Sequence, residues 1–336
     1  MASSGGAATG PESDAQAAPS DPELRMVLLG KTGAGKSSSG NSILGSELFK
    51  AEVSPRSVTS QCERRSSCVS GRCVTVIDTP GFFDTRRSNQ QVAGEMARCI
   101  LLSLPGPHAF LVVLQVGRLT QEEKDALQWI EVTYGERALE FTMVLFTWGD
   151  QLRDKPIEKY MAESEELQEF VQRCRGGCHV FNNTAPGNRD QVSTLLEKIE
   201  KMVEANGGSF YTNEIFQEAE RAIREVQEQL MVDRRSEVDG EGPESKGELD
   251  ERMEEKARKQ AERLFWCEMI TAVGKGAAEG VGILSKGESP KRGKVAKKAV
   301  QLASSPLSLT SAAKALGGAV REGSKVLYKH RKTFLH

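Results

Sequence analysis

The chain has 336 residues, of which 38% are hydrophobic, and its formal net charge is −2, so it can build a sizeable core without a strong overall electrostatic bias. No uninterrupted apolar run approaches the roughly twenty residues that a membrane-spanning helix needs, which excludes a membrane-spanning chain. Its seven cysteines are an odd number for a disulfide framework, and we expect them to stay reduced.

Residues 1–22 are rich in Ala, Gly, Ser and Pro and show no apolar periodicity, so we expect them to be disordered. They contain no apolar stretch of the kind that a signal peptide needs, and Ala2 in place of glycine excludes ordinary N-myristoylation. The sequence therefore predicts a cytoplasmic protein with at most a peripheral contact to an intracellular membrane.

A glycine-rich loop follows the strand predicted at residues 24–29 and precedes a predicted helix, which is the arrangement of a P-loop for nucleotide phosphates. Lys36 would reach the β- and γ-phosphates, and the Ser37 hydroxyl would bind Mg²⁺. A glycine-rich turn without a ligand is the alternative, and the preceding strand disfavours it. The nucleotide-binding residues predicted here are Gly30, Lys31, Thr32, Gly33, Ala34, Gly35, Lys36, Ser37 and Ser38.

Two further motifs end apolar strands. Asp78 and Gly81 form a DxxG motif, in which the carboxylate would hold magnesium through a water and the glycine amide would bind the γ-phosphate. Thr147 and Asp150 follow the apolar run 141–146 and resemble the base-reading TKxD motif of GTPases. An ionised Asp150 matches the two donors on the Watson–Crick edge of guanine, which adenine does not present. The predicted ligands are therefore GTP, GDP and Mg²⁺, and an ATP-using kinase is disfavoured.

Strands and helices alternate along this part of the chain, which predicts an α/β domain with a mostly parallel sheet covered on both faces. Ligands of such sheets bind at the carboxyl ends of the strands, where the three motifs would converge. Helices are predicted at residues 37–44, 90–102, 121–134, 157–174 and 190–205.

A family resemblance rests on longer segments. These are Gly30-Lys-Thr-Gly-Ala-Gly-Lys-Ser-Ser-Ser-Gly-Asn-Ser-Ile-Leu-Gly45, Ser57-Val-Thr59, Asp78-Thr-Pro-Gly-Phe-Phe-Asp84, Pro105-Gly-Pro-His108 and Gly117-Arg-Leu-Thr120. Over roughly residues 24–232 the chain resembles the immunity-associated GTPases, the GIMAP or IAN family. The resemblance implies a Ras-like P-loop GTPase domain, similar to those of septins and plastid outer-envelope import GTPases. It also implies pairing through the nucleotide face, as a homo-oligomer or with related GTPases.

The resemblance also assigns roles that the residues alone do not reveal. It makes Thr59 the switch I threonine that closes on Mg²⁺ and the γ-phosphate. It places Asn182 in the last base-contacting loop, where the adjacent Asn183 is an open alternative. It implies that Arg118 is an arginine finger supplied in trans by a partner domain, with a plain surface arginine as the alternative.

Two residues depart from the usual GTPase pattern. Phe82 follows the DxxG motif where Ras-type GTPases have a water-orienting glutamine, so we expect slow intrinsic hydrolysis. Trp148 stands at the usual lysine position of the base motif, where an indole can stack on the base. Two hypotheses follow: a slow, dimerisation-stimulated GTPase, favoured by Arg118, and a non-hydrolysing, GTP-loaded oligomeric scaffold on membranes, favoured by Phe82.

Beyond a break at residues 206–208, apolar spacing predicts a helix, and the family resemblance implies that this helix packs on the GTPase domain. A charged helix is predicted near 248–270, and its apolar stripe permits coiled-coil pairing. Residues 271–336 contain thirteen Lys or Arg against three Glu, a net charge of +10 that leaves −12 for residues 1–270. We expect this tail to dock on anionic membrane, with a solvated tail as the alternative. Nucleic-acid binding is disfavoured because the tail has few aromatic residues. The predicted divisions are 1–22 disordered, 23–206 GTPase domain, 207–239 helical extension, 240–270 charged helix and 271–336 basic tail.

Overall fold

The computed structural model describes residues 23–52, 58–81, 89–185, 187–238 and 246–280, together with residues 318 and 320. The segments 1–22 and 82–88, the junction at 239–245 between the predicted helical extension and the charged helix, and most of the basic tail lie outside the described residues. None of the described helices combines the length and the apolar character that a membrane crossing requires.

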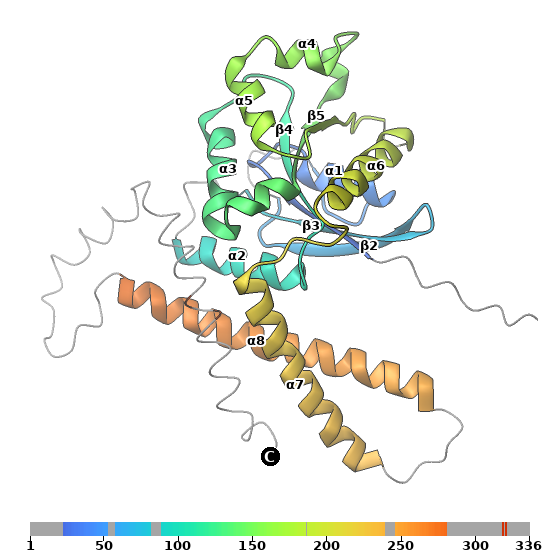
Figure 1. Ribbon diagram of the computed structural model, residues 1–336, viewed down its shortest axis with the longest axis vertical. Coiled ribbons are helices and arrows are strands. Elements are labelled where there is room, and N and C mark those ends of the chain that lie inside the picture. The colour runs from blue at the N-terminus through green and yellow to red at the C-terminus, as the bar shows by residue number, and fades with distance from the viewer. Residues whose placement is uncertain are drawn as a thin grey trace, which may run out of the picture.

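The centre of the domain is a six-stranded sheet in the order β2-β3-β1-β4-β5-β6 (Figure 1). β2 is antiparallel to β3, and the other neighbours are parallel. This arrangement and the helices on both faces confirm the predicted α/β class. The strands are β1 Leu24–Leu29, β2 Glu63–Val69, β3 Arg72–Asp78, β4 Ala109–Gln115, β5 Thr142–Thr147 and β6 Cys178–Val180.

The register of the central strands brings the motif-bearing ends together. Leu28 of β1 pairs with Asp78 of β3, and Gln115 of β4 pairs with Thr147 of β5. Of the parallel strands, β1, β3, β4 and β5 are almost wholly buried, as their nearly continuous apolar sequences require. Their carboxyl ends therefore lie along one edge of the sheet, which is where the predicted motifs begin.

Helices cover the two faces of the sheet with separate apolar cores. One core joins α1 and α6 to inward-facing residues of β1, β3, β4 and β5, and the other joins α2, α3 and α5 to the opposite face. The helices of the domain are α1 Lys36–Leu44, α2 Asn89–Leu102, α3 Gln121–Tyr134, α4 Ile157–Met161, α5 Glu165–Arg173 and α6 Asp190–Ala205, with short 3-10 turns η1 Glu136–Phe141 and η2 Gly149–Leu152.

The prediction of one helix at 157–174 is wrong in one respect, because the structure has two helices there, α4 and α5. Ser164 is the N-cap of α5, and its side chain accepts a hydrogen bond from the Leu167 backbone N–H at 3.3 Å. Serine competes for backbone hydrogen bonds in this way, and the acidic residues that follow it favour a new helix start. The break separates a short helix beside the base motif from one that packs into the core.

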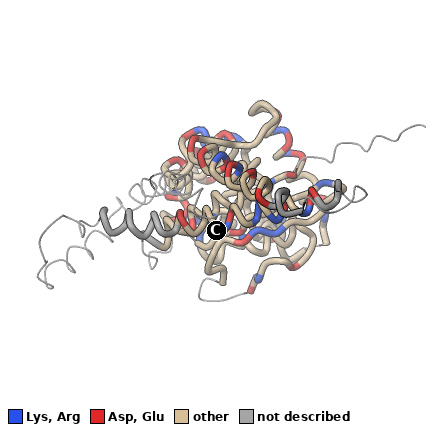
Figure 2. Tube along the Cα trace, turned by 90° about the horizontal axis from the view of Figure 1, so that it is seen from below, with Lys and Arg blue, Asp and Glu red and all other residues tan. Residues whose placement is uncertain are grey.

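Two long helices extend the domain at its C-terminal side, α7 Glu214–Val238 and α8 Lys246–Gly280. α8 packs against both α7 and α2 (Figure 1). Arg258 of α8 donates two hydrogen bonds of 2.8 Å to the carboxylate of Glu220 on α7, a bidentate pair that fixes how the two helices meet. α8 is longer than the helix predicted near 248–270. Figure 2 shows acidic and basic residues interspersed along the described backbone.

Candidate functional site

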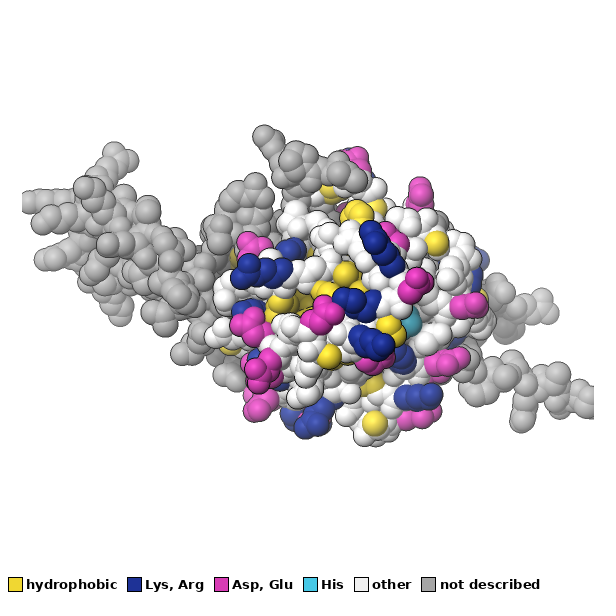
Figure 3. Space-filling view, turned by 90° about the horizontal axis from the view of Figure 1, so that it is seen from above, with side chains coloured by type: hydrophobic (Ala, Val, Ile, Leu, Met, Phe, Trp, Pro, Cys, Tyr) yellow, Lys and Arg dark blue, Asp and Glu magenta, His cyan; other side chains and the backbone are white. Residues whose placement is uncertain are grey.

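A cavity of about 410 Å³ opens where the carboxyl ends of β1, β3 and β5 meet. Its walls come from the P-loop, the first turn of α1, the segments around 50–52 and 58–59, Gly81, the residues after β5 and the loop after β6. Figure 3 shows hollows with hydrophobic floors between charged side chains of both signs on the upper face of the molecule. The cavity volume lies in the usual range for small-molecule sites.

Glycines in and opposite the P-loop permit close backbone contacts. Gly30 adopts φ 150°, and a Cβ at this residue would lie 2.5 Å from the carbonyl oxygen of Val113. A Cβ at Gly81 would lie 2.4 Å from Thr32 Oγ1, so the DxxG motif touches the P-loop directly. Side chains larger than hydrogen therefore cannot be accommodated at either position without displacing the loop.

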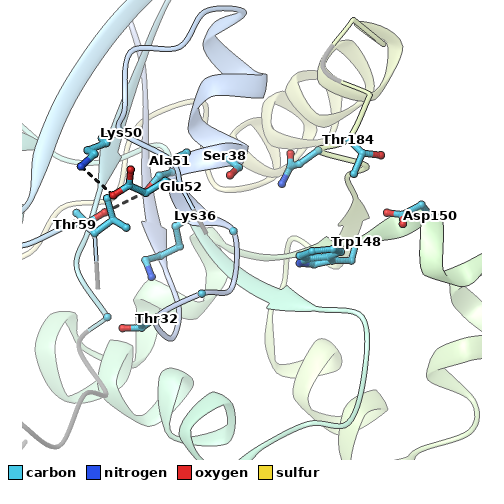
Figure 4. A pocket seen from close by; sticks show the side chains of 16 residues that line it. Thr32, Lys36, Ser38, Lys50, Ala51, Glu52, Thr59, Trp148, Asp150 and Thr184 are labelled. Carbon is cyan, nitrogen blue, oxygen red and sulfur yellow. Dashed lines mark hydrogen bonds and ion pairs between the residues drawn. The ribbon is translucent and has the colours of Figure 1, made fainter. Parts of the chain in front are cut away.

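The P-loop holds the Lys36 ammonium inside its turn. Lys36 is 6% exposed, and its Nζ donates hydrogen bonds of 2.9 Å to the carbonyl oxygens of Gly30 and Lys31. Figure 4 shows the Lys36 side chain running back toward the part of the P-loop that carries Thr32. A fixed positive charge at the N-terminus of α1 makes this end of the cavity attractive to anions.

Three oxygen-bearing side chains predicted to bind the metal converge beside Lys36. Ser37 Oγ donates to Asp78 Oδ2 at 2.6 Å, and Thr59 Oγ1 donates to the same oxygen at 3.1 Å. The two hydroxyl oxygens are 3.1 Å apart. The structure thus brings together residues from α1, the segment after residue 57 and the end of β3, although they are far apart in sequence. Two hydroxyls and one carboxylate are hard oxygen donors of the kind that Mg²⁺ takes.

Two buried oxygen atoms at this end of the cavity have no partner among the described residues, Asp78 Oδ1 and Thr32 Oγ1. Burial raises the pKa of Asp78 from its ordinary value, opposed by the hydrogen bond from Ser37 and the charge of Lys36. A buried carboxylate oxygen with no donor is costly unless a cation or a donor satisfies it. The residues present therefore fit a magnesium ion bound with nucleotide phosphates, and Asp78 and Ser37 would hold it with Thr59.

The opposite end of the cavity carries the predicted base motif. Trp148 adopts a left-handed backbone conformation with φ 60° and ψ 40°, and its indole, 41% exposed, lines the cavity together with Asp150 (Figure 4). Gly149 follows, where a Cβ would lie 2.6 Å from Val180 Cγ1. The left-handed backbone conformation of Trp148 is rare for a large residue and is typical of functional sites. A flat aromatic face beside an acidic side chain suits a planar base that carries hydrogen-bond donors.

Two predicted base-loop residues lie elsewhere than expected. Thr147 is fully buried and does not line the cavity, and its hydroxyl donates to the Ala34 carbonyl oxygen at 2.7 Å. Asn182 is also outside the cavity wall, and its Oδ1 accepts hydrogen bonds from the backbone N–H and hydroxyl of Thr184. Asn183 does line the cavity, and its side-chain amide contacts Ser39 and Ser42 of α1.

Arg118 lies in the middle of the loop between β4 and α3, outside the cavity wall. The residue is exposed, and within the part of the chain that the structure describes its guanidinium makes no hydrogen bond or ion pair. The structure therefore presents this arginine to solvent rather than to the cavity of its own chain.

Several cavity residues were not predicted from the sequence. Lys50 and Glu52, which form an ion pair of 3.0 Å, stand on one side of the cavity, and Thr184 stands beside the base motif (Figure 4). They belong to irregular segments without a motif of their own. Their one sequence signal is proximity to Thr59 and Asn182, the residues that the family resemblance singled out.

The chain matches the AIG1 family over residues 24–230. It is 36% identical over 221 residues to immune-associated nucleotide-binding protein 9 of Arabidopsis thaliana, covering 63% of this chain and 65% of that protein. It is 34% identical over 194 residues to GTPase IMAP family member 8 of Homo sapiens, covering 57% of this chain and 29% of that protein. The chain thus spans less than two thirds of the length of these relatives.

Among solved structures, the chain is similar to Toc33 from Arabidopsis thaliana in complex with GDP and Mg²⁺, with 19% identity and a TM-score of 0.43 over 54% of this chain and 84% of that one. It is also similar to Era in complex with MgGDPNP and nucleotides of 16S ribosomal RNA, with 13% identity and a TM-score of 0.42 over 63% of this chain and 67% of that one. The match to the AIG1 family model covers the sheet, the P-loop, the DxxG motif and the base motif, and it ends within α7.

Because this model matches more than half of the sequence, the chain belongs to the AIG1 family.

Proposed function

We propose that this protein binds GTP and GDP with Mg²⁺, hydrolyses GTP slowly, and hydrolyses it faster when two G domains pair and Arg118 acts in trans. The observation that carries the proposal is the polarity of one cavity. Lys36, Ser37 and Thr59 mark a phosphate and metal end, and Trp148 with Asp150 marks a base end. A guanine nucleotide has both features, joined by a ribose.

The residues of the chain would divide the work as follows. Lys36 and the P-loop amides would hold the β- and γ-phosphates and neutralise their charge. Asp78 and the two hydroxyls of Ser37 and Thr59 would fix the Mg²⁺, which supplies charge stabilisation at the transferring phosphoryl group. Asp150 would accept hydrogen bonds from the Watson–Crick edge of guanine, and Trp148 would cover its face.

The water-activating part of the site is incomplete within one chain. Phe82, which lies outside the described residues, takes the place of the glutamine that orients water in Ras-type GTPases. Arg118 is exposed and is not part of the cavity wall. An arginine from a partner domain would stabilise the charge that develops on the γ-phosphoryl group. Pairing, with a second copy or with a related GTPase, would therefore raise the hydrolysis rate.

The second candidate function is a GTP-loaded scaffold that assembles on membranes and hydrolyses little or no GTP. Phe82 supports this alternative because it removes one route to water activation. The charge division supports the membrane part, since +10 falls in residues 271–336 and −12 in the rest. On this alternative, GTP binding would control assembly, and Arg118 would serve only as a surface residue.

The test is GTP turnover per molecule, measured over a range of protein concentrations for the wild type, Arg118→Ala and Arg137→Ala. Arg137 is an exposed arginine in η1, beyond the other end of α3, and serves as the matched control. We expect turnover to rise with concentration in the wild type and in Arg137→Ala, and to fall at least about tenfold in Arg118→Ala while GTP still binds. Turnover that is flat with concentration and equal in all three proteins would move the assignment to the scaffold.

A further inference from the structure

The loop that carries Arg118 is attached at both of its ends to other parts of the domain. It runs from Gly117, just after β4, to Thr120, the N-cap of α3. Arg118 itself extends into solvent from the middle of this loop. The backbone on either side of the arginine therefore determines the direction in which the side chain leaves the surface.

Tyr160 of α4 holds the first end. Its hydroxyl accepts a hydrogen bond of 2.8 Å from the Gly117 N–H and donates one to the Gly117 carbonyl oxygen. The ring packs edge-on against Phe146 of β5, with centroids 6.1 Å apart. One side chain thus pairs both polar groups of a single peptide residue, and it does so from the helix next to the base motif.

Glu123 of α3 holds the second end. Its Oε2 accepts hydrogen bonds from the Thr120 N–H at 2.8 Å and from the Thr120 hydroxyl at 2.9 Å. Its other oxygen, Oε1, forms an ion pair of 3.1 Å with Nζ of Lys31. Lys31 belongs to the P-loop, and its backbone carbonyl oxygen accepts a hydrogen bond from the Lys36 ammonium. The Glu123 side chain is only 3% exposed, and Lys31 is the cation that compensates its buried charge.

We propose that Tyr160 and Glu123 are positioning residues for Arg118, fixing its loop between the base end and the phosphate end of the nucleotide site. The inference rests on the proposed role of Arg118 in trans. Arginine has a long side chain with much conformational freedom, so an arginine finger acts well only when its backbone is held in place. Lys31 is part of the P-loop that would bind the phosphates. Its ion pair with Glu123 therefore links the P-loop to the carboxylate that caps α3.

Gly117 is exposed, so water could pair its N–H and carbonyl groups if the tyrosine hydroxyl were absent. The Tyr160 ring, not its hydroxyl, makes the apolar contact with Phe146. Removal of the hydroxyl alone therefore frees the loop while the packing stays in place, which makes Tyr160→Phe the sharpest variant.

The experiment combines hydrogen exchange with turnover. Variants are Tyr160→Phe, Glu123→Ala, the conservative Glu123→Gln, which keeps an acceptor for Thr120, and Glu166→Ala as control. Glu166 is an exposed residue of α5 whose carboxylate pairs with Lys124 of α3 at 2.8 Å. We expect faster amide exchange at Gly117 in Tyr160→Phe and at Thr120 in Glu123→Ala, with wild-type exchange at both in Glu166→Ala. Glu123→Gln should recover most of the protection at Thr120.

We expect concentration-dependent GTP turnover to fall about fivefold in Tyr160→Phe and in Glu123→Ala, with GTP affinity retained. In an Arg118→Ala background neither variant should lower turnover further, since all three changes act through one side chain. If amide exchange at Gly117 in Tyr160→Phe and at Thr120 in Glu123→Ala equals that of the wild type, the inference is overturned, whether or not Arg118→Ala changes turnover. If Arg118→Ala lowers turnover and the two variants do not, the positioning role is wrong while the proposed function stands. If Arg118→Ala has no effect, the role of Arg118 fails, and the positioning role fails with it.

Discussion

The hydroxyl of Thr147 donates a hydrogen bond to the backbone carbonyl oxygen of Ala34, 2.7 Å away, and so joins the last residue of β5 to the P-loop. The Leu114 carbonyl oxygen lies 3.2 Å from the same hydroxyl, on β4. All residues of β5 are buried in the sheet, so the hydrogen bond from Thr147 holds the P-loop against the sheet. The threonine of the base motif thus supports the loop at the phosphate end of the cavity.

We predict that Thr147→Val lowers GTP affinity about fivefold, because valine has the same shape but cannot donate to the Ala34 carbonyl. Thr142→Val is the matched control. Thr142 is equally buried, and its hydroxyl donates to the Ala138 carbonyl oxygen at 2.8 Å at the other end of β5. Calorimetric titration with GTP would show the difference, and equal affinities in the two variants would contradict the P-loop role.

Lys36→Ala should abolish detectable nucleotide binding, since the phosphates lose the ammonium that the loop holds in place. Lys155→Ala is a suitable control, because Lys155 pairs with Glu163 on the surface near α4. Binding of a fluorescent GTP analogue reports on both. Retention of wild-type affinity in Lys36→Ala would remove the P-loop from the nucleotide site.

Asp150→Asn should shift nucleotide preference from GTP toward xanthosine triphosphate, because an amide can donate to the additional carbonyl of xanthine. The measurement is a competition between the two nucleotides for the wild type and the variant. Trp148 gives a second readout, because its exposed indole lines the cavity and its fluorescence should change on binding. An unaltered preference would place base recognition in another residue.

Asp78→Asn should raise the thermal midpoint of the nucleotide-free protein, because the change removes a buried charge whose Oδ1 has no donor among the described residues. The same variant should lose the stabilisation that GTP with Mg²⁺ gives the wild type. Asp125→Asn, at a half-buried residue whose Oδ1 accepts a hydrogen bond from Gln121 at the surface, is the control. A lower midpoint in nucleotide-free Asp78→Asn would show that its carboxylate stabilises the empty site.

His108 predicts how stability changes in mild acid. Burial, with the nearby charge of Arg25, lowers the pKa of His108 from 6.5 to about 4. Between these values the unfolded chain binds a proton and the folded chain does not, so stability falls as the pH drops from about 6.5 to about 4. His108→Asn keeps an acceptor for the Arg25 N–H, which bonds to His108 Nδ1 at 3.0 Å, and cannot titrate. Its midpoint should fall less between about pH 7 and pH 5 than that of the wild type.

Patterns that repeat along the chain predicted most of the domain. The helices at Gln121–Tyr134 and Asp190–Ala205 begin and end where the sequence placed them. The first has a capping box, because Glu123 accepts a hydrogen bond from the Thr120 N–H. The break at Ser164 was missed because the apolar spacing continues through it into Leu167 and Phe170.

Contacts between distant segments could not be predicted. Tyr160 meets Gly117 across 43 residues, and no pattern in either segment indicates the contact. Asn182 and Asn183 are chemically identical neighbours, so only the turn at Thr184 separates the one that lines the cavity from the one that does not. The P-loop and DxxG motifs predicted that Ser37 and Asp78 lie together, and the family resemblance added Thr59. The role of these three residues as metal ligands stays a prediction.

The burial of α8 extends the cooperative folding unit well past the family match. Ala261, Phe265 and Met269 of α8 lie in the same apolar core as Met96 of α2 and Trp129 of α3. A chain cut after residue 230 would keep every residue of the nucleotide cavity but would expose this surface of α2 to water. Such a fragment would bind its ligand and still aggregate, because a continuous apolar surface of that kind associates with itself.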